Sequence, residues 1–247
     1  MSMFNSNHAS NSRTPSWEKA DVSRCETWLF DLDNTLYPAS VDFFSQMDRK
    51  MKAFIAKALD LTPEEAFQIQ KCYYHEYGTT LRGLMVRHAL EPEEFLEYVH
   101  AVDHSILKPD PALDAALAAL PGRKMVFTNG PEKHAIAVLE RLGVERHFTA
   151  IFDIHAADYI PKPSPEPYRC LVQRHHVRPE RAVMVEDTLK NLPPAAALGI
   201  TTVWLRPPPP ACAERSLDTD GRCCHYAIDH LPSWLATVGA GTHIGAL

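Results

Sequence analysis

The sequence predicts an α/β fold, in which a parallel sheet has helices on both faces and further helices are inserted after the first strand. From residue 112 onward, short apolar runs alternate with helical segments, which is the pattern of a doubly wound parallel sheet. Between residues 40 and 107, helical patterns follow one another with no strand pattern among them. We therefore expect the inserted helices to form a cap over a site on the sheet.

Composition and charge limit the kinds of partner. The chain has 247 residues, enough for one large domain or a core with an insertion. A net charge of -6 and an isoelectric point near 6.1 argue against a nucleic acid polymer or an anionic membrane as the main partner. No secretory signal is visible, and no apolar run approaches the roughly 18 residues that a membrane span needs. We expect a cytoplasmic protein.

Cysteine and histidine patterns do not predict a disulfide framework or a zinc site. The six cysteines are scattered and form no C-x-x-C pair, which is typical of thiols in a reducing compartment. The thirteen histidines include no H-E-x-x-H spacing, and the adjacent His175 and His176 would point apart on a helix. Any metal site is therefore expected to use carboxylates.

The first predicted strand ends in two carboxylates. An apolar run ends at Phe30, so Asp31 falls at the carboxyl end of a buried strand, where ligands bind in open α/β sheets. If the chain turns there, Asp31 and Asp33 face one cavity. Such a pair could hold a divalent cation, or supply a nucleophile and a general acid or base. Alternatively, Asp33 and Asn34 simply open a turn or cap a helix.

Four helices are expected in the cap. Apolar residues recur at helical spacing over residues 41–59. Thr62, Pro63 and Glu65 form an N-cap, a first-turn proline and a capping box for a helix that runs to Tyr77 and stops near Gly78. Two shorter helices are expected near residues 80–88 and 92–100.

The remaining elements alternate as the fold class requires. Strands are predicted at residues 124–128, 150–152, 182–186 and 201–205, with an edge strand at 225–229. Helices are predicted at residues 112–120, 131–142, 165–175 and 192–198. Pro207 begins a stiff proline-rich spacer. The predicted organisation is a disordered tail at 1–22, a core at 23–39 and 108–235, the cap at 40–107, and a loose tail at 236–247.

Polar groups follow the predicted strands. Thr128 follows the second strand, Glu186 and Asp187 end a later one, and Lys162 lies in a loop stiffened by prolines. Alone, these residues could be a turn, a helix start and a solvated lysine. Because parallel strands end side by side, we expect them to converge with Asp31 on one crevice. There Thr128 and Lys162 could hold phosphoryl oxygens, and the carboxylates could bind Mg²⁺.

Four ordered motifs carry a resemblance to a known family. Residues 30–36, Thr128-Asn129, Lys162-Pro163 and residues 185–188 resemble the motifs of the haloacid dehalogenase superfamily. The resemblance covers residues 25–206. It implies a Rossmann-like core with a helical cap and an Mg²⁺-dependent phosphohydrolase activity.

The resemblance also implies a role for each residue. Asp31 would be the nucleophile, and Asp33 would protonate the leaving alcohol and then activate water. Thr128 would bind the phosphoryl group and Lys162 would neutralise it. The expected metal ligands are Asp31, the backbone carbonyl of Asp33, and Asp187, with Glu186 bound directly or through water. Asn129 and Asn191 would orient the substrate site.

A narrower resemblance concerns the substrate. Residues 33–38, 73–84 and 106–110 resemble the pyrimidine 5′-nucleotidase subgroup, which implies that Tyr77, Thr80 and Arg82 face the core and read a nucleoside. These side chains could equally serve cap packing. The pair Glu186-Asp187 departs from the two aspartates expected there, which leaves the direct ligation of Glu186 open.

Competing interpretations remain at this stage. The expected partner is a nucleoside monophosphate, hydrolysed by a monomer or homodimer. A sugar-phosphate phosphatase or phosphomutase is the alternative, because core motifs do not fix the substrate. A metal-independent haloacid dehalogenase is disfavoured by the additional carboxylates of Asp33 and Asp187. A receiver-type signalling module is disfavoured by the spacing of Asp31 and Asp33 and by the helical insertion.

Overall fold

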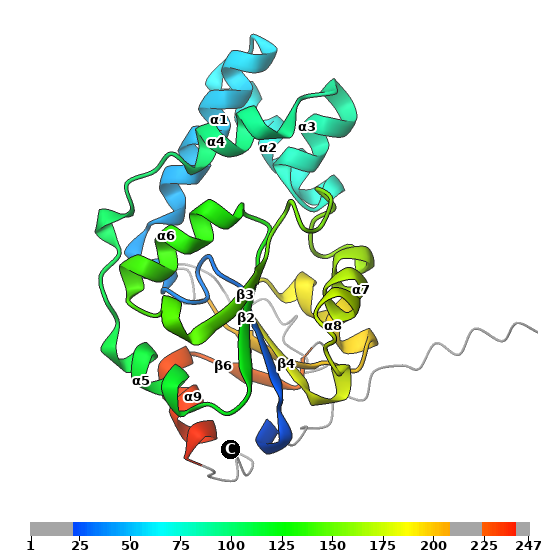
Figure 1. Cartoon of the computed structure of the whole chain (residues 1–247). Coiled ribbons are helices and arrows are strands. Elements are labelled where there is room, and N and C mark those ends of the chain that lie inside the picture. Colours follow the sequence, from blue (N-terminus) through cyan, green and yellow to red (C-terminus); the bar gives the residue numbers. More distant parts are fainter. Residues whose placement is uncertain (1–21, 208–223, 241–247) are drawn as a thin grey trace, which may run out of the picture.

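A six-stranded sheet forms the centre of the computed structural model, which describes residues 22–207 and 224–240 (Figure 1). All pairings are parallel, and the strand order is β3-β2-β1-β4-β5-β6. The strands are β1 (Thr27–Phe30), β2 (Arg123–Phe127), β3 (Phe148–Phe152), β4 (Ala182–Glu186), β5 (Thr201–Leu205) and β6 (Tyr226–Ile228). The predicted Rossmann-like α/β class is confirmed.

The register of the central strands positions the site. β1 lies between β2 and β4, and Phe30 is level with Val126 and Val185. Asp31, the residue after β1, is therefore level with the end of β2 and with Glu186. The chain proceeds from β1 toward β3 on one side and later toward β6 on the other, so this edge is the switch point at which doubly wound sheets bind ligands.

Helices cover both faces of the sheet. α5 (Pro111–Ala119), α6 (Glu132–Leu142) and α9 (Leu231–Gly239) share a core with Trp28 and Phe30 of β1. On the other face, α7 (Pro165–Arg174) and α8 (Leu192–Ala197) share a core with Leu29. Alternate residues of β1 thus enter different cores, which explains why Trp28, Leu29 and Phe30 form a continuous apolar run.

Two predicted boundaries change at the ends of the described residues. Helix α9 runs to Gly239, so residues 236–239, expected in a loose tail, are helical. The side chain of Val238 packs into the core, which extends the domain beyond residue 235. Val22, expected in the disordered tail, is buried at the start of a short 3-10 turn. Residues 1–21, the spacer beyond Pro207 and residues 241–247 lie outside the described residues.

Four helices form the cap: α1 (Phe44–Leu59), α2 (Pro63–Tyr77), α3 (Thr80–His88) and α4 (Pro92–His100). They lie together beyond the carboxyl ends of the strands (Figure 1). The predicted capping box is present, with Thr62 and Glu65 bonded to each other's backbone. The predicted first helix begins three residues late, because residues 39–41 form a 3-10 turn.

Specific contacts join the cap to the core. Glu93, near the start of α4, accepts hydrogen bonds from Tyr159 Oη at 2.7 Å and from His155 Nε2 at 3.1 Å. Elsewhere, the Lys190 ammonium lies 3.5 Å from the centre of the Tyr74 ring. The cap is thus attached to the core at two places around the cavity described below.

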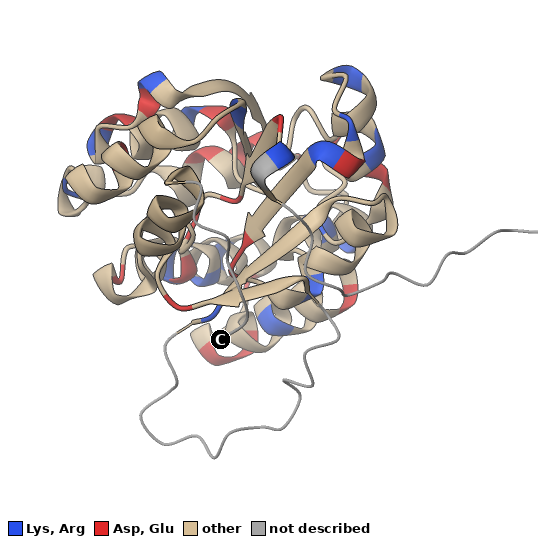
Figure 2. Ribbon diagram, turned by 90° about the horizontal axis from the view of Figure 1, so that it is seen from below, with Lys and Arg blue, Asp and Glu red and all other residues tan. Residues whose placement is uncertain are grey.

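The distribution of charge agrees with the composition. Acidic and basic residues are interspersed along the helices (Figure 2). Among the described residues, no helix combines the length and apolarity that crossing a membrane requires.

Candidate active site

A tight turn after β1 brings the first two carboxylates to one cavity. The backbone N–H groups of Thr35 and Leu36 both donate to Leu32 O, and Asn34 has a φ of 61°. Asparagine tolerates this left-handed conformation better than most residues, which explains its place here. Asp31 and Asp33 consequently line the same cavity, as predicted for a turning chain.

The Lys162 ammonium is buried among three acceptors. Its Nζ donates to Asp31 Oδ1 and Glu186 Oε2, both at 2.7 Å, and to Phe127 O at 2.8 Å. These bonds use all three ammonium protons. Burial opposes the charge, but the two carboxylates outweigh it and raise the pKa of Lys162. Lys162 is only 1% exposed, so it is a fixed cation of the site.

Thr128 and Asn129 organise the loop after β2. Both polar groups of the Asn129 side chain bind the backbone of Lys162: Oδ1 accepts from its N–H at 2.8 Å, and Nδ2 donates to its carbonyl at 3.2 Å. Asn129 therefore holds Lys162 in place. Thr128 Oγ1 accepts from the Gly130 N–H at 2.9 Å, which orients the hydroxyl so that its proton can be donated to a ligand in the cavity.

Three carboxylates form an oxygen-rich cluster. Asp31, Glu186 and Asp187 each offer an oxygen, and these atoms lie within 4.8 Å of one another. An all-oxygen donor set suits a hard divalent cation. Asp31 and Glu186 both accept from Lys162 Nζ, and their other oxygens accept from Thr35 Oγ1 and from the Thr188 N–H, each at 3.2 Å. Asp187 accepts a longer bond from Thr188 Oγ1 at 3.3 Å, so it is the best placed of the three to be a direct ligand.

The protonation of this cluster also favours a cation. Burial raises the pKa of Asp31 to about 7, with the charge of Glu186 adding to the effect. Burial likewise raises the pKa of Glu186 to about 7 and that of Asp187 to about 6. One lysine does not compensate the three negative charges, so a cation bound by them would relieve their repulsion.

Asn191 also lines the cavity. Its backbone carbonyl accepts from Tyr168 Oη at 2.6 Å, and its side-chain Oδ1 is buried without a partner in the described residues. A buried acceptor of this kind needs a water or a ligand to satisfy it. The predicted orienting role of Asn191 remains a prediction.

Asp33 occupies a different environment from Asp31. Its Oδ1 accepts from Tyr37 Oη at 2.6 Å and from His134 Nε2 at 2.9 Å. Burial favours the protonated carboxyl, but the interaction with His134 and the two hydrogen bonds outweigh it and lower the pKa of Asp33. The two carboxylates of one turn therefore have opposite pKa shifts, which is the pattern expected when neighbouring acids serve different purposes.

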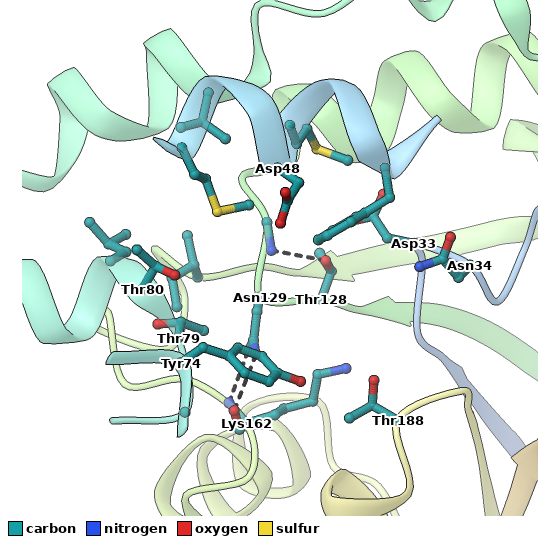
Figure 3. Close-up of a pocket in the computed structure, with 18 of the residues that line it drawn as sticks. Asp33, Asn34, Asp48, Tyr74, Thr79, Thr80, Thr128, Asn129, Lys162 and Thr188 are labelled. Atoms are coloured by element: carbon teal, nitrogen blue, oxygen red, sulfur yellow. Dashed lines mark hydrogen bonds between the residues drawn. The ribbon is translucent and has the colours of Figure 1, made fainter. Parts of the chain in front are cut away.

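A cavity of about 330 Å³ separates the cap from these core residues (Figure 3). The apolar part of its cap wall is formed by Phe44, Met47, Met51, Phe95, Leu96 and Val99, and the ion pair of Lys71 with Asp48 also lines the cavity. Gln70 and Tyr74, one helical turn apart on α2, add polar atoms to this wall. Gln70 Nε2 donates to Asp48 at 2.9 Å, whereas Gln70 Oε1 is buried without a partner among the described residues.

The structure separates the predicted cap residues. Thr80 lines the cavity, although its hydroxyl donates to Gln70 O at 3.2 Å. Tyr77 and Arg82 do not line it; they line a second cavity between the cap and the loop around Pro161. Of the core residues predicted for the site, all line the first cavity: Asp31, Asp33, Thr128, Asn129, Lys162, Glu186, Asp187 and Asn191.

Sequence reasoning did not find His134, Tyr37 or Gln70. His134 lies on the buried face of α6, where its neighbours in the helical pattern are apolar. A polar residue on such a face is the signal that could have indicated it. No comparable signal marks Gln70 on α2, which also carries several other polar residues.

Comparison with known proteins agrees with this geometry. Residues 25–199, most of the chain, match the family model described as haloacid dehalogenase-like hydrolase. The chain belongs to the haloacid dehalogenase-like hydrolases. The predicted resemblance to that superfamily is confirmed, whereas no comparison tests the narrower subgroup.

This haloacid dehalogenase-like hydrolase is similar in sequence to two curated proteins. It is 31% identical over 195 residues to the glyceraldehyde 3-phosphate phosphatase of Methanopyrus kandleri, covering 72% of this chain and 82% of that protein. It is 27% identical over 193 residues to phosphate metabolism protein 8 of Saccharomyces cerevisiae, covering 71% of this chain but only 60% of that protein. The chain thus spans about three fifths of the yeast relative.

A solved structure shares the fold of this haloacid dehalogenase-like hydrolase. The crystal structure of a phosphatase of this family from Thermococcus onnurineus aligns with a TM-score of 0.55 at 19% identity. The alignment covers 88% of this chain and 98% of that one. This similarity establishes the architecture and says nothing about the substrate.

Proposed function

We propose that the protein is a Mg²⁺-dependent phosphomonoester hydrolase that works through an aspartyl-phosphate. The observation that carries this proposal is the convergence of four side chains: Lys162 donates hydrogen bonds to Asp31 and Glu186, and oxygens of Asp31, Glu186 and Asp187 lie within 4.8 Å of one another. A nucleophilic carboxylate, a fixed cation and a hard-metal donor set are what phosphoryl transfer requires. A metal-independent dehalogenase would not need the Asp187 carboxylate.

The reaction has two displacements. Asp31 attacks phosphorus, the P–O bond to the leaving group breaks, and Asp33 gives the departing oxygen its proton. Water then attacks the phosphorus of the aspartyl-phosphate, Asp33 takes a proton from that water, and Asp31 leaves as a carboxylate with inorganic phosphate. The arriving phosphate brings negative charge beside Asp33, which favours the protonated form needed for the first displacement.

Lys162 and Thr128 support both displacements. Lys162 offsets negative charge on the transferring group, and Thr128 donates its hydroxyl proton to a phosphoryl oxygen. Asp31, Asp187 and the backbone carbonyl of Asp33 would hold the Mg²⁺, with Glu186 contributing through water. When bound, the ion supplies further charge stabilisation for the transferring phosphoryl group.

For the substrate, we propose a small phosphorylated carbohydrate. The name of the Methanopyrus kandleri relative supports this class, and a cavity of about 330 Å³ suits a small ligand. A pyrimidine nucleoside monophosphate is the second candidate. It is favoured by the apolar cap wall, in which Met47, Met51 and Tyr74 could pack against a base.

A substrate panel tests the proposal. Purified protein is assayed for phosphate release from triose, pentose and hexose phosphates, from phosphoglycolate, and from pyrimidine and purine monophosphates, with Mg²⁺ or EDTA. We expect turnover that EDTA stops and Asp31→Asn abolishes, with the highest kcat/KM on a sugar phosphate. Turnover by the Asp31→Asn variant at the wild-type rate would refute the mechanism. A preference for UMP or CMP would instead select the second candidate.

A further inference from the structure

Both hydrogen bonds that hold the Asp33 carboxylate are accepted by the same oxygen, Oδ1. Tyr37 Oη and His134 Nε2 both donate to Oδ1, at 2.6 and 2.9 Å. Tyr37 lies four residues along the same turn, whereas His134 comes from α6, 101 residues away. Two donors on one oxygen fix the plane of the carboxylate and leave Oδ2 for the cavity that Asp33 lines.

His134 is itself held rigidly. It is 2% exposed, and its ring stacks on Phe43 with centroids 5.9 Å apart and an interplanar angle of 9°. On the other ring nitrogen, Nδ1 lies 3.3 Å from His104 Nε2. Since an ionised carboxylate only accepts, Nε2 must carry the proton donated to Asp33, while the contact with His104 holds the other edge of the ring.

Three of the residues around His134 come from the cap and its return segment. His104 lies in a 3-10 turn (His104–Ile106) between α4 and α5, and His100 ends α4. The His100 ring lies 4.9 Å from that of His134, and its Nδ1 bonds to Leu96 O at 2.8 Å. Phe43 precedes α1. The surroundings of His134 therefore exist only when the cap helices are docked on the core.

We infer that His134 is a positioning residue for Asp33: its Nε2–H, together with Tyr37, clamps Oδ1 so that Oδ2 exchanges the proton with the leaving group and with water. His104 and Phe43 fix the ring, so the docked cap holds the acid in its working orientation. This inference rests on the proposed phosphohydrolase function and adds a residue to it.

Another histidine of the core domain offers a comparison. His147 pairs through Nε2 with Asp114 of α5 at 2.6 Å, and Asp114 does not line the cavity. The two pairs share the Nε2–carboxylate bond, although Asp114 also pairs with Arg146. His147 is therefore a matched control for His134.

The test compares two substrates whose leaving groups differ in their need for a proton. The kcat/KM value reports the first displacement, in which an alkyl alcohol must be protonated but p-nitrophenolate can depart unprotonated. We expect His134→Leu to lower kcat/KM about 10- to 100-fold for the best alkyl phosphate of the substrate panel, and less than about threefold for p-nitrophenyl phosphate. His134→Gln retains a donor near the position of Nε2, and should recover most of the lost activity.

Controls separate positioning from folding. His147→Leu should change both substrates equally. In an Asp33→Asn background, His134→Leu should have little further effect, because nothing remains to be positioned. Equal losses on the two substrates, or additive losses in the double variant, would refute the inference while leaving the proposed function intact. Absence of any phosphatase activity in the wild-type protein would refute the proposed function itself.

Discussion

Lys162 Nζ lies 2.7 Å from Asp31 Oδ1, although 131 residues separate them in the chain. The same ammonium lies 2.7 Å from Glu186 Oε2. The lysine therefore bridges the end of β1 to the end of β4 and neutralises part of the charge that their carboxylates bring into the core. In the proposed mechanism, catalysis and folding would depend on the same cation.

Replacing Lys162 should consequently damage both properties. Lys162→Met leaves Asp31 and Glu186 buried without their counter-charge, and we expect the free energy of unfolding to fall by about 3–5 kcal/mol. The kcat should fall by about 100-fold or more, since the phosphoryl charge is no longer offset. Urea unfolding with EDTA present measures the first effect. Adding Glu186→Gln should restore part of the stability but none of the activity; no recovery of stability would contradict this account.

Much of the site could be predicted because its residues adjoin regular elements. Asp31 and Thr128 directly follow apolar strands, and Glu186 ends one, so the rule for parallel sheets places them together. The burial of Lys162 follows from no such rule, since a loop lysine gives no local indication that it will be buried. The helix patterns of the cap were also readable from spacing and capping residues.

The rest depends on how the cap docks. Helix α2 carries two adjacent stripes: Gln70 with Tyr74, and Tyr73 with Tyr77, whose rings lie 5.8 Å apart. The sequence shows both stripes but not which one faces the cavity, because rotation of a helix by one residue exchanges them. Tyr77 belongs to the stripe that lines the second cavity, and its predicted role in reading a nucleoside stays a prediction. His134 was hidden for a related reason: its partners come from three segments distant in sequence.

A second prediction concerns Glu186. Because its oxygens accept from Lys162 and from the Thr188 N–H, we expect Glu186→Gln to weaken Mg²⁺ activation less than about fivefold. Asp187→Asn removes a direct ligand and should weaken it by about 100-fold. Both values come from phosphate release titrated with Mg²⁺. If Glu186→Gln weakened Mg²⁺ as strongly as Asp187→Asn, Glu186 would be a direct ligand after all.

A third prediction concerns pH in the absence of metal. Burial raises the pKa of Asp31 from 3.8 to about 7, so the folded protein holds a proton that the unfolded chain releases. This contribution stabilises the fold fully below about pH 4, and it is lost as pH rises to about 7. Because Asp31→Asn is neutral at every pH, its melting temperature in EDTA should exceed that of the wild type increasingly as pH rises.

Mg²⁺ should reverse this trend for the wild type. Metal binding competes with protons on the same carboxylates, so the rise in melting temperature on adding Mg²⁺ should grow from about pH 5 to about pH 8. Differential scanning calorimetry with Mg²⁺ or EDTA provides the measurement. A Mg²⁺ effect independent of pH would mean that the three carboxylates are already ionised without the metal.

The final prediction concerns Gln70, which is 3% exposed and has a buried Oε1 without a partner in the described part of the chain. An unsatisfied buried acceptor lowers the stability of the fold by about 1–3 kcal/mol. We therefore expect Gln70 Oε1 to accept a hydrogen bond from a hydroxyl or amide of the substrate. Gln70→Leu should therefore leave the free energy of unfolding unchanged or higher, while KM rises about tenfold with kcat nearly constant.

A matched variant distinguishes Gln70 from cap packing in general. Met51→Leu conserves the apolar character of the same cavity wall and should leave KM within about twofold. The contrast between the two variants isolates the polar atom, since both replace a cavity-lining side chain with leucine. An unchanged KM in Gln70→Leu, measured on the best substrate of the panel, would mean that the acceptor is satisfied by water and plays no part in recognition.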